Sequence, residues 1–184
     1  SKLYIMTKKE TKTAILTMLD QGESKSKTFA SFTGKDLKDR AIAHLIASHA
    51  NPALLSKHAK LIDAMIVISW LQLTVGVLLS LALISNMGMT AGIIFTLFVA
   101  GFCYLFVWGF SHSKAWAYNA TILLTMINLP KSLNGFSEDP ISTMIGFLVG
   151  VSLFGFTWFV RNKIFPDFLV FGPRKIKGQF VFTS

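Results

Sequence analysis

The sequence predicts an all-α integral membrane protein, with a bundle of four transmembrane helices between a small helical N-terminal subdomain and a basic, aromatic C-terminal tail. Of the 184 residues, 52% are apolar and only 15% are charged, which is too apolar for an ordinary soluble domain of this length. Four apolar segments follow one another after residue 60. Of the eighteen Lys and Arg residues, eleven lie in residues 1–60 and five in residues 161–184.

Residues 1–59 are predicted to form a basic cytoplasmic subdomain of about three short helices. Four apolar residues have the spacing of one face of a first helix: Ala14, Ile15, Met18 and Leu19. Further helices are expected at residues 24–32 and 35–48, and Asn51-Pro52 is typical of a helix start that leads into the first span. The positive charge would suit nucleic acid, but the apolar positions fit a helix-turn-helix poorly. We therefore expect no nucleic-acid partner.

The first span is predicted at residues 61–84, within a membrane-embedded region of residues 60–160. Its 24 residues would extend ~36 Å as a helix, enough for a hydrocarbon core of ~30 Å. Asp63 is the one acid within a span, which makes it a candidate functional group. Lys60 lies three residues earlier on the same helix face. We therefore expect a local Lys60–Asp63 ion pair at the interface rather than a proton or ion site.

The second and third spans are predicted at residues 90–110 and 115–130. The second carries no charge, whereas the third is short and polar. Thr121, Thr125 and Asn128 share one face of the third, at i, i+4 and i+7. A stripe of this kind is either a seam for helix packing or the lining of an aqueous path.

The fourth span, residues 141–160, follows a helix-initiating proline at Pro140. It contains Gly146-x-x-x-Gly150, which matches the small-residue motif that lets transmembrane helices approach closely. These two glycines are the predicted helix-packing positions.

The tail, residues 161–184, alternates phenylalanines with prolines, glycines and cations. We expect it to lie along the membrane surface, with its cations on anionic lipid headgroups; these are Arg161, Lys163, Arg174, Lys175 and Lys177. The alternative is that the tail packs on the N-terminal helices. The pattern Phe165-Pro166, Phe171-Gly172-Pro173-Arg174-Lys175 and Gly178 resembles small bacterial inner-membrane proteins without assigned roles, and it indicates no named family.

Both the number of spans and the charge distribution predict the orientation. Four spans place the two termini on the same side, and both terminal regions are basic, which indicates the cytoplasmic side. Loops 85–89 and 131–140 would then lie outside. We expect an integral protein of the bacterial inner (plasma) membrane with both termini cytoplasmic.

No nucleotide-binding loop, nucleophile elbow or HExxH motif is present, so we expect no catalytic residue, cofactor or metal. Three functions remain open. The first is a non-catalytic accessory or regulatory subunit that binds a membrane protein partner. The second is a small channel or transporter, a homo-oligomer with the third span lining the path. The third is a membrane enzyme acting on lipid through His112 or Asp63.

Overall fold

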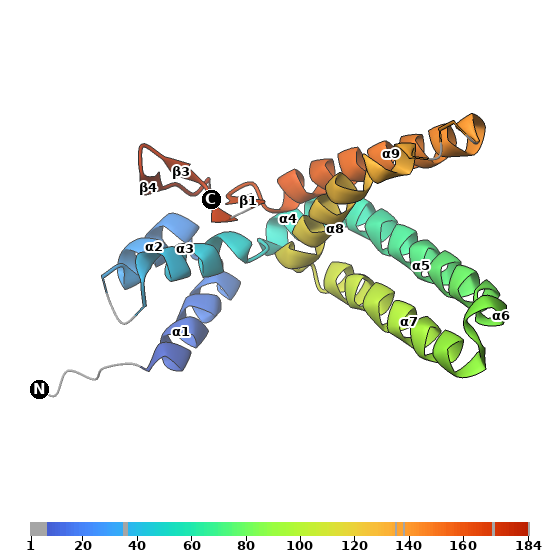
Figure 1. Ribbon diagram of the computed structural model, residues 1–184. Helices are drawn as coiled ribbons and strands as arrows, with labels where there is room; N and C mark the ends of the chain where they lie inside the picture. Colours follow the sequence, from blue (N-terminus) through green and yellow to red (C-terminus); the bar gives the residue numbers. More distant parts are fainter. Residues whose placement is uncertain (1–6, 35–36, 135, 138, 171, 184) are drawn as a thin grey trace, which may run out of the picture.

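The computed structural model describes residues 7–34, 37–134, 136–137, 139–170 and 172–183. It is mostly helical, and Figure 1 shows two regions. Helices α1 to α4 and the strands after α9 form a head at one end of the molecule, and two long helical hairpins extend away from it. The described parts of the N-terminal and C-terminal regions therefore lie at the same end of the long helices.

Three short helices build the N-terminal part of the head: α1 (Lys8–Asp20), α2 (Lys25–Phe32) and α3 (Asp39–Ser48). Thr7 and Glu10 form a reciprocal capping box at the start of α1. The chain turns after α1 at Gly22, whose φ of 84° suits a residue without Cβ. Buried apolar residues from all three helices form one core: Ile15, Leu19, Phe32, Ile42 and Ile46. The predicted apolar face of the first helix contributes two of them.

A short helix joins the head to the membrane region. Helix α4 (Pro52–Lys57) begins where the sequence predicts, with the Asn51 side chain accepting a hydrogen bond from the backbone N–H of Ala53. His58 is the C-cap of α4, and α5 (Ala59–Ala82) begins at the next residue. The first long helix therefore starts two residues before the predicted span and is separated from α4 by one residue.

The first hairpin pairs α5 with α7 (Met89–Ser111), through the single turn of α6 (Ile84–Met87). Gly88 between α6 and α7 has a φ of 82°, which explains a glycine at this turn. A Cβ at Gly92 would lie 2.8 Å from Ile84 Cα. Glycine at this position thus allows α7 to start directly against α6.

The second hairpin pairs α8 (Ala115–Asn128) with α9 (Pro140–Ile164), and a 3₁₀ turn, η1 (Lys131–Leu133), lies between them. Gly109, near the end of α7, lets the start of α8 approach, because a Cβ there would lie 2.6 Å from Ala117 Cβ. The Asp139 side chain accepts a hydrogen bond from Ser142 N and caps α9.

Within the described residues, three helices are long and apolar enough to cross a membrane: α5, α7 and α9, with 24, 23 and 25 residues. This is compatible with an integral membrane protein. The predicted span at residues 115–130 forms a helix of 14 residues, only ~21 Å long, which does not by itself cross ~30 Å of hydrocarbon; the chain continues through η1 to the start of α9. The two hairpins meet near the head and diverge away from it (Figure 1). The predicted four-helix bundle is therefore not confirmed.

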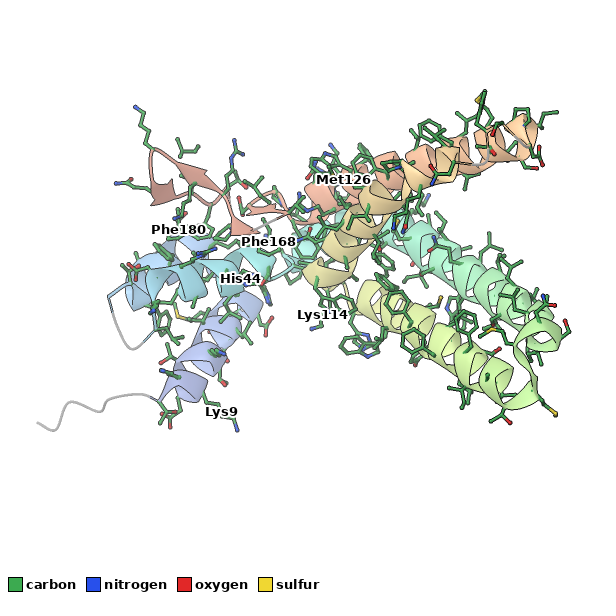
Figure 2. The ribbon with its side chains drawn as sticks, in the orientation of Figure 1. Lys9, His44, Lys114, Met126, Phe168 and Phe180 are labelled. Atoms are coloured by element: carbon green, nitrogen blue, oxygen red, sulfur yellow. The ribbon has the colours of Figure 1, made fainter. Side chains whose placement is uncertain are left out.

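The tail folds back on the N-terminal helices. Two short antiparallel pairs follow α9: β1 (Phe168–Leu169) with β2 (Gly172–Pro173), and β3 (Lys175–Ile176) with β4 (Gln179–Phe180). The Phe29 ring of α2 contacts the rings of Phe180 and Phe182, at centroid distances of 5.6 and 5.4 Å. The tail therefore packs on the head (Figure 2), and its expected position along the membrane surface stays a prediction.

Candidate functional site

The polar residues of α8 face a cavity between the two hairpins. Thr121, Thr125 and Asn128 all line this cavity, which has a volume of about 310 Å³. Leu124 of α8 also lines it. The other three helices complete the wall, with Ser69 and Gln72 from α5, Phe102, Cys103 and Phe106 from α7, and Leu153 from α9. The predicted stripe therefore faces the space between the two hairpins, with Thr121 buried, Thr125 half-buried and Asn128 exposed.

A second, more apolar cavity of about 560 Å³ lies between α5 and α9. It shares Gln72 and Leu153 with the first cavity. The remaining residues of its wall are Ile68, Leu71, Leu148, Val149, Ser152 and Phe156. Because the two cavities share a wall, we treat them as one inter-hairpin cleft, defined by the residues that line either cavity.

Two of the four hydroxyl groups in the inter-hairpin cleft, those of Ser69 and Thr121, are satisfied by their own helices. The Thr121 hydroxyl donates to the Ala117 carbonyl at 2.9 Å, and the Ser69 hydroxyl donates to the Met65 carbonyl at 2.9 Å. Such bonds back to the preceding turn allow serine and threonine to face an apolar environment. The Thr121 and Ser69 hydroxyls therefore do not require a ligand.

The two side-chain amides in the cleft differ from these hydroxyls. Neither the Gln72 nor the Asn128 side chain makes a hydrogen bond to any other described residue. Gln72 lies thirteen residues after the start of α5, and Asn128 lies at the far end of α8. Each is thus ~20 Å from the head, well inside the apolar part of the hairpins. Two amides with unused donors and acceptors therefore face the cleft.

A buried arginine connects the second hairpin to the tail. Arg161, near the end of α9, is only 1% exposed. Its Nε donates to Asn119 Oδ1 of α8 at 2.9 Å, and its Nη1 donates to Asn162 Oδ1 at 2.9 Å. Its Nη2 donates to the carbonyl of Phe168 in β1. This burial does not agree with the expected headgroup contact at Arg161, because its guanidinium is used to hold α8, α9 and the tail together.

A buried ion pair connects the tail to α2. Lys25 Nζ lies 3.4 Å from Asp167 Oδ2, and both side chains are almost inaccessible to water. The Asp167 carboxylate also accepts hydrogen bonds from the backbone N–H and the hydroxyl of Thr183. Burial lowers the pKa of Lys25 below its usual value, while the attraction of Asp167 opposes this shift. The two ends of the chain are therefore joined by a desolvated polar contact.

The other predicted lipid contacts are exposed: Lys163, Arg174, Lys175 and Lys177. Asp63 and Lys60 are exposed as well, and in the described part of the chain no ion pair within 4.0 Å joins them. The expected Lys60–Asp63 pair is thus not formed here. Of the predicted packing glycines, Gly150 faces Leu129, the C-cap residue of α8. A Cβ added at Gly146 would meet no atom of another described element within 4 Å.

The histidines do not gather into a metal site: the described residues contain no group of three or more His, Cys, Asp or Glu that could hold a metal. The Nε2 of His49 lies 3.2 Å from Asp20 Oδ1, without the alignment of a hydrogen bond. The Nδ1 of His112 lies 2.9 Å from the Trp108 carbonyl. Neither arrangement positions a group for catalysis.

Gln72 is the residue of the cleft that sequence reasoning missed. It is a single amide within an apolar run of α5, and that position alone was a signal, because a polar residue in a span tends to contact another helix. No protein-family model, curated protein or solved structure matches this chain. The argument for function therefore depends on the geometry of the cleft.

Proposed function

We propose that this chain is a non-catalytic subunit of a membrane complex, whose inter-hairpin cleft binds a transmembrane helix of a partner protein. One observation carries this proposal: the amides of Gln72 and Asn128 face the cleft without hydrogen-bond partners. Leaving an amide unpaired in hydrocarbon costs several kcal/mol. A helix with its own polar side chains would satisfy both amides and cover the apolar wall at the same time.

The divergence of the hairpins supports a helix as the occupant. The α5–α9 side of the cleft is apolar, and large side chains on it are strongly exposed, with 63% for Leu71 and 56% for Leu148. An α-helix with its side chains is ~10–12 Å wide, and its apolar surface matches such a wall. The short α8 adds to the opening, because its 14 residues accompany only part of the 25-residue α9.

The membrane orientation follows from charge and aromatic residues near the head. Lys57, Lys60, Lys114 and Lys163 are exposed there. Trp108, Trp116 and Trp158, each 41–43% exposed, lie close to the head ends of α7, α8 and α9. Tryptophan favours the headgroup zone, and lysine favours the cytoplasmic side. These features support a head that faces the cytoplasm, so reporter fusions at Asn86 and Asn134 should read extracytoplasmic, with one at the C-terminus reading cytoplasmic.

The test is the composition of the complex that is purified in mild detergent. We expect a second protein to co-purify with the full chain, and Gln72→Leu combined with Asn128→Leu to release it, because both hydrogen-bonding groups are lost. Thr74→Val is the matched control: Thr74 is exposed on the same helix, but its hydroxyl is already bonded to the Trp70 carbonyl. A monomer without any companion, unchanged by the double variant, would contradict the proposal.

The second candidate function is a homo-oligomeric channel or transporter. The observation that favours it is that Thr121, Thr125 and Asn128 line one cavity together with Ser69 and Gln72, which gives a polar path along α8. Water would then satisfy the amides. A symmetric homo-oligomer in the same purification, with ion or solute flux that is reduced by Thr125→Val, would support this function instead.

A further inference from the structure

A separate pocket lies at the junction of the head, the tail and the second hairpin. Its volume is about 620 Å³. Helix α3 contributes His44, and the turn after it contributes His49; the start of α8 contributes Lys114 and Trp116, and Phe168 of β1 closes one side. Figure 2 shows His44 beside Phe168, and Lys114 at the base of α8. We call this cavity the junction pocket; it shares no residue with the inter-hairpin cleft.

The end of the junction pocket nearest the head is polar and positively charged. Lys114 is exposed and forms no ion pair within the described residues. It is also the N-cap residue of α8, and no side chain caps this helix, so the first N–H groups of α8 add partial positive charge beside its ammonium group. His49 Nε2 has no hydrogen-bond partner. Asp20 lies against His49, but neither Asp20 nor any other described acid lines the pocket.

The other end of the junction pocket is apolar and follows α8 into the membrane region. Trp116, Ala120 and Leu123 line it at i, i+4 and i+7. At 100° per residue this face points ~140° away from the face of Thr121, Thr125 and Asn128. Ile127, 58% exposed, extends the same apolar face beyond the pocket. Helix α8 therefore presents a polar face to the inter-hairpin cleft and an apolar face to the junction pocket.

The order of these groups matches the order of groups in a lipid molecule. Tryptophan and lysine favour the headgroup level of a membrane, and the apolar face of Ala120 and Leu123 follows Lys114 and Trp116 along α8. We propose that the junction pocket binds one glycerophospholipid, with its phosphodiester at Lys114 and the start of α8 and one acyl chain along Trp116, Ala120 and Leu123. This site requires only that the hairpins lie in a membrane, so it is independent of the partner helix.

The site explains why charge and apolar surface occur together here. A free phosphate would use Lys114 and the helix end but would leave the apolar face uncovered, whereas a simple acyl chain would not use the charge. A charge-assisted hydrogen bond to phosphate is among the stronger polar contacts. The junction pocket therefore differs from the tail cations Arg174, Lys175 and Lys177, none of which lines it.

The first test is the binding of dioleoyl phosphatidylglycerol to the delipidated full chain in detergent micelles, measured by native mass spectrometry. We expect one lipid to bind preferentially, and Lys114→Gln to weaken this binding about tenfold, which is the loss expected for one charge-assisted hydrogen bond. Lys163→Gln is the matched control, because Lys163 is an exposed lysine near the head end of α9 that does not line the pocket. Equal losses in both variants would indicate general surface charge and would overturn the proposal.

The second test concerns the acyl chain and the source of the phosphate. Ala120→Trp fills the apolar end, so we expect it to reduce lipid binding as strongly as Lys114→Gln does, while the helical circular dichroism and the elution volume stay unchanged. If Ala120→Trp fails to fold, Ala120→Val replaces it in the experiment. We expect this smaller replacement to keep most of the lipid binding. Unchanged binding in a folded Ala120→Trp, or displacement of the lipid by inorganic phosphate alone, would show that no acyl chain is held here.

Discussion

The head and the hairpins bury their side chains in different ways. In the head and at its junction, the buried charged groups have partners within the chain, as the Lys25–Asp167 pair and the Arg161 guanidinium show, whereas the buried Thr28 and Tyr118 hydroxyls have no hydrogen-bond partner among the described residues. In the most apolar 18-residue stretch of each of the helices α5, α7 and α9, only 17%, 17% and 11% of the residues are buried inside the protein. Water favours internal burial of apolar groups in the head, whereas lipid is as apolar as the side chains that it contacts.

This difference predicts two classes of mutational effect. Substitutions in the head should change the free energy of unfolding of the isolated chain, because the lost contacts are internal. Substitutions in the inter-hairpin cleft should leave that free energy nearly unchanged and should alter association, because the missing contacts belong to another molecule. The following variants test this division, from the largest expected effect to the smallest.

The largest effect is expected for Asp167→Leu. It leaves the buried Lys25 ammonium without its carboxylate and removes the acceptor of Thr183. Removing one partner of a buried pair costs about 3–5 kcal/mol. The pKa of Lys25 is already lowered, so the unpaired amine can become neutral more easily, and we expect a loss of unfolding free energy near ~3 kcal/mol. Chemical denaturation of the full chain in micelles, followed by circular dichroism, measures this cost.

The double variant Lys25→Met/Asp167→Leu serves as the control for the ion pair. It replaces both charges with apolar side chains of similar length, and such replacements are often nearly neutral. We expect it to regain most of the stability that Asp167→Leu loses. If the single and double variants were equally unstable, the pair would contribute through packing rather than through charge.

A somewhat smaller effect is expected for Arg161→Met. It keeps the aliphatic volume but leaves the Asn119 amide oxygen and the Phe168 carbonyl without their donor. Buried acceptors without partners cost about 1–3 kcal/mol each, so we expect a total loss of about 2–3 kcal/mol and earlier proteolysis of the tail. Lys163→Met, an exposed neighbour two residues along, should change neither quantity; equal sensitivity of both variants would contradict an internal role for Arg161.

A pH-dependent effect is expected in the head. Burial lowers the pKa of His49, with Asp20 opposing the shift and Lys25 and Lys114 reinforcing it. The unfolded chain therefore binds a proton at His49 more readily than the folded chain does, so stability should fall as the pH drops below about 6.5. Asp20→Asn should steepen this loss, because it removes the one charge that favours protonated His49, and His49→Gln should flatten it. A stability that is independent of pH between 5 and 7 in all three proteins would contradict this assignment.

The smallest effect is expected for Asp63→Asn. Asp63 is exposed near the head end of α5 and is not paired with Lys60. Exposed pairs contribute little even where they form, so stability and assembly should be unchanged in denaturation and gel-filtration experiments. Loss of assembly in this variant would show that Asp63 contacts a partner at the membrane interface.

Local features of the fold could be predicted from the sequence because local rules determine them. The helix start at Asn51-Pro52 and the tight turn before α7 are where the capping and glycine patterns place them. The spacing of Thr121, Thr125 and Asn128 predicts that they share one face of a helix, and all three line the inter-hairpin cleft.

Long-range features could not be predicted in the same way. Lys25 and Asp167 are 142 positions apart, and nothing in their local sequence indicates that they meet. Arg161 directly follows an apolar segment, which is typical of a headgroup contact. It is nevertheless buried, because α8 and β1 supply its hydrogen-bond acceptors. The divergence of the hairpins is also invisible in composition, since a helix surface that faces lipid and one that faces another helix are similarly apolar.

The most direct measurement uses the single cysteine of the chain, Cys103, which lies in the wall of the inter-hairpin cleft. A photoreactive group on this thiol in native membranes should cross-link to a second polypeptide, and the yield should fall in the Gln72→Leu/Asn128→Leu variant. The control is the double variant Cys103→Ser/Leu97→Cys, which carries the same label at position 97 of α7. Because Leu97 is 67% exposed, this variant measures the cross-linking background of lipid-facing positions. Cross-links from Cys103 to lipid alone, at the yield of this background, would contradict the central claim that the cleft holds a partner helix.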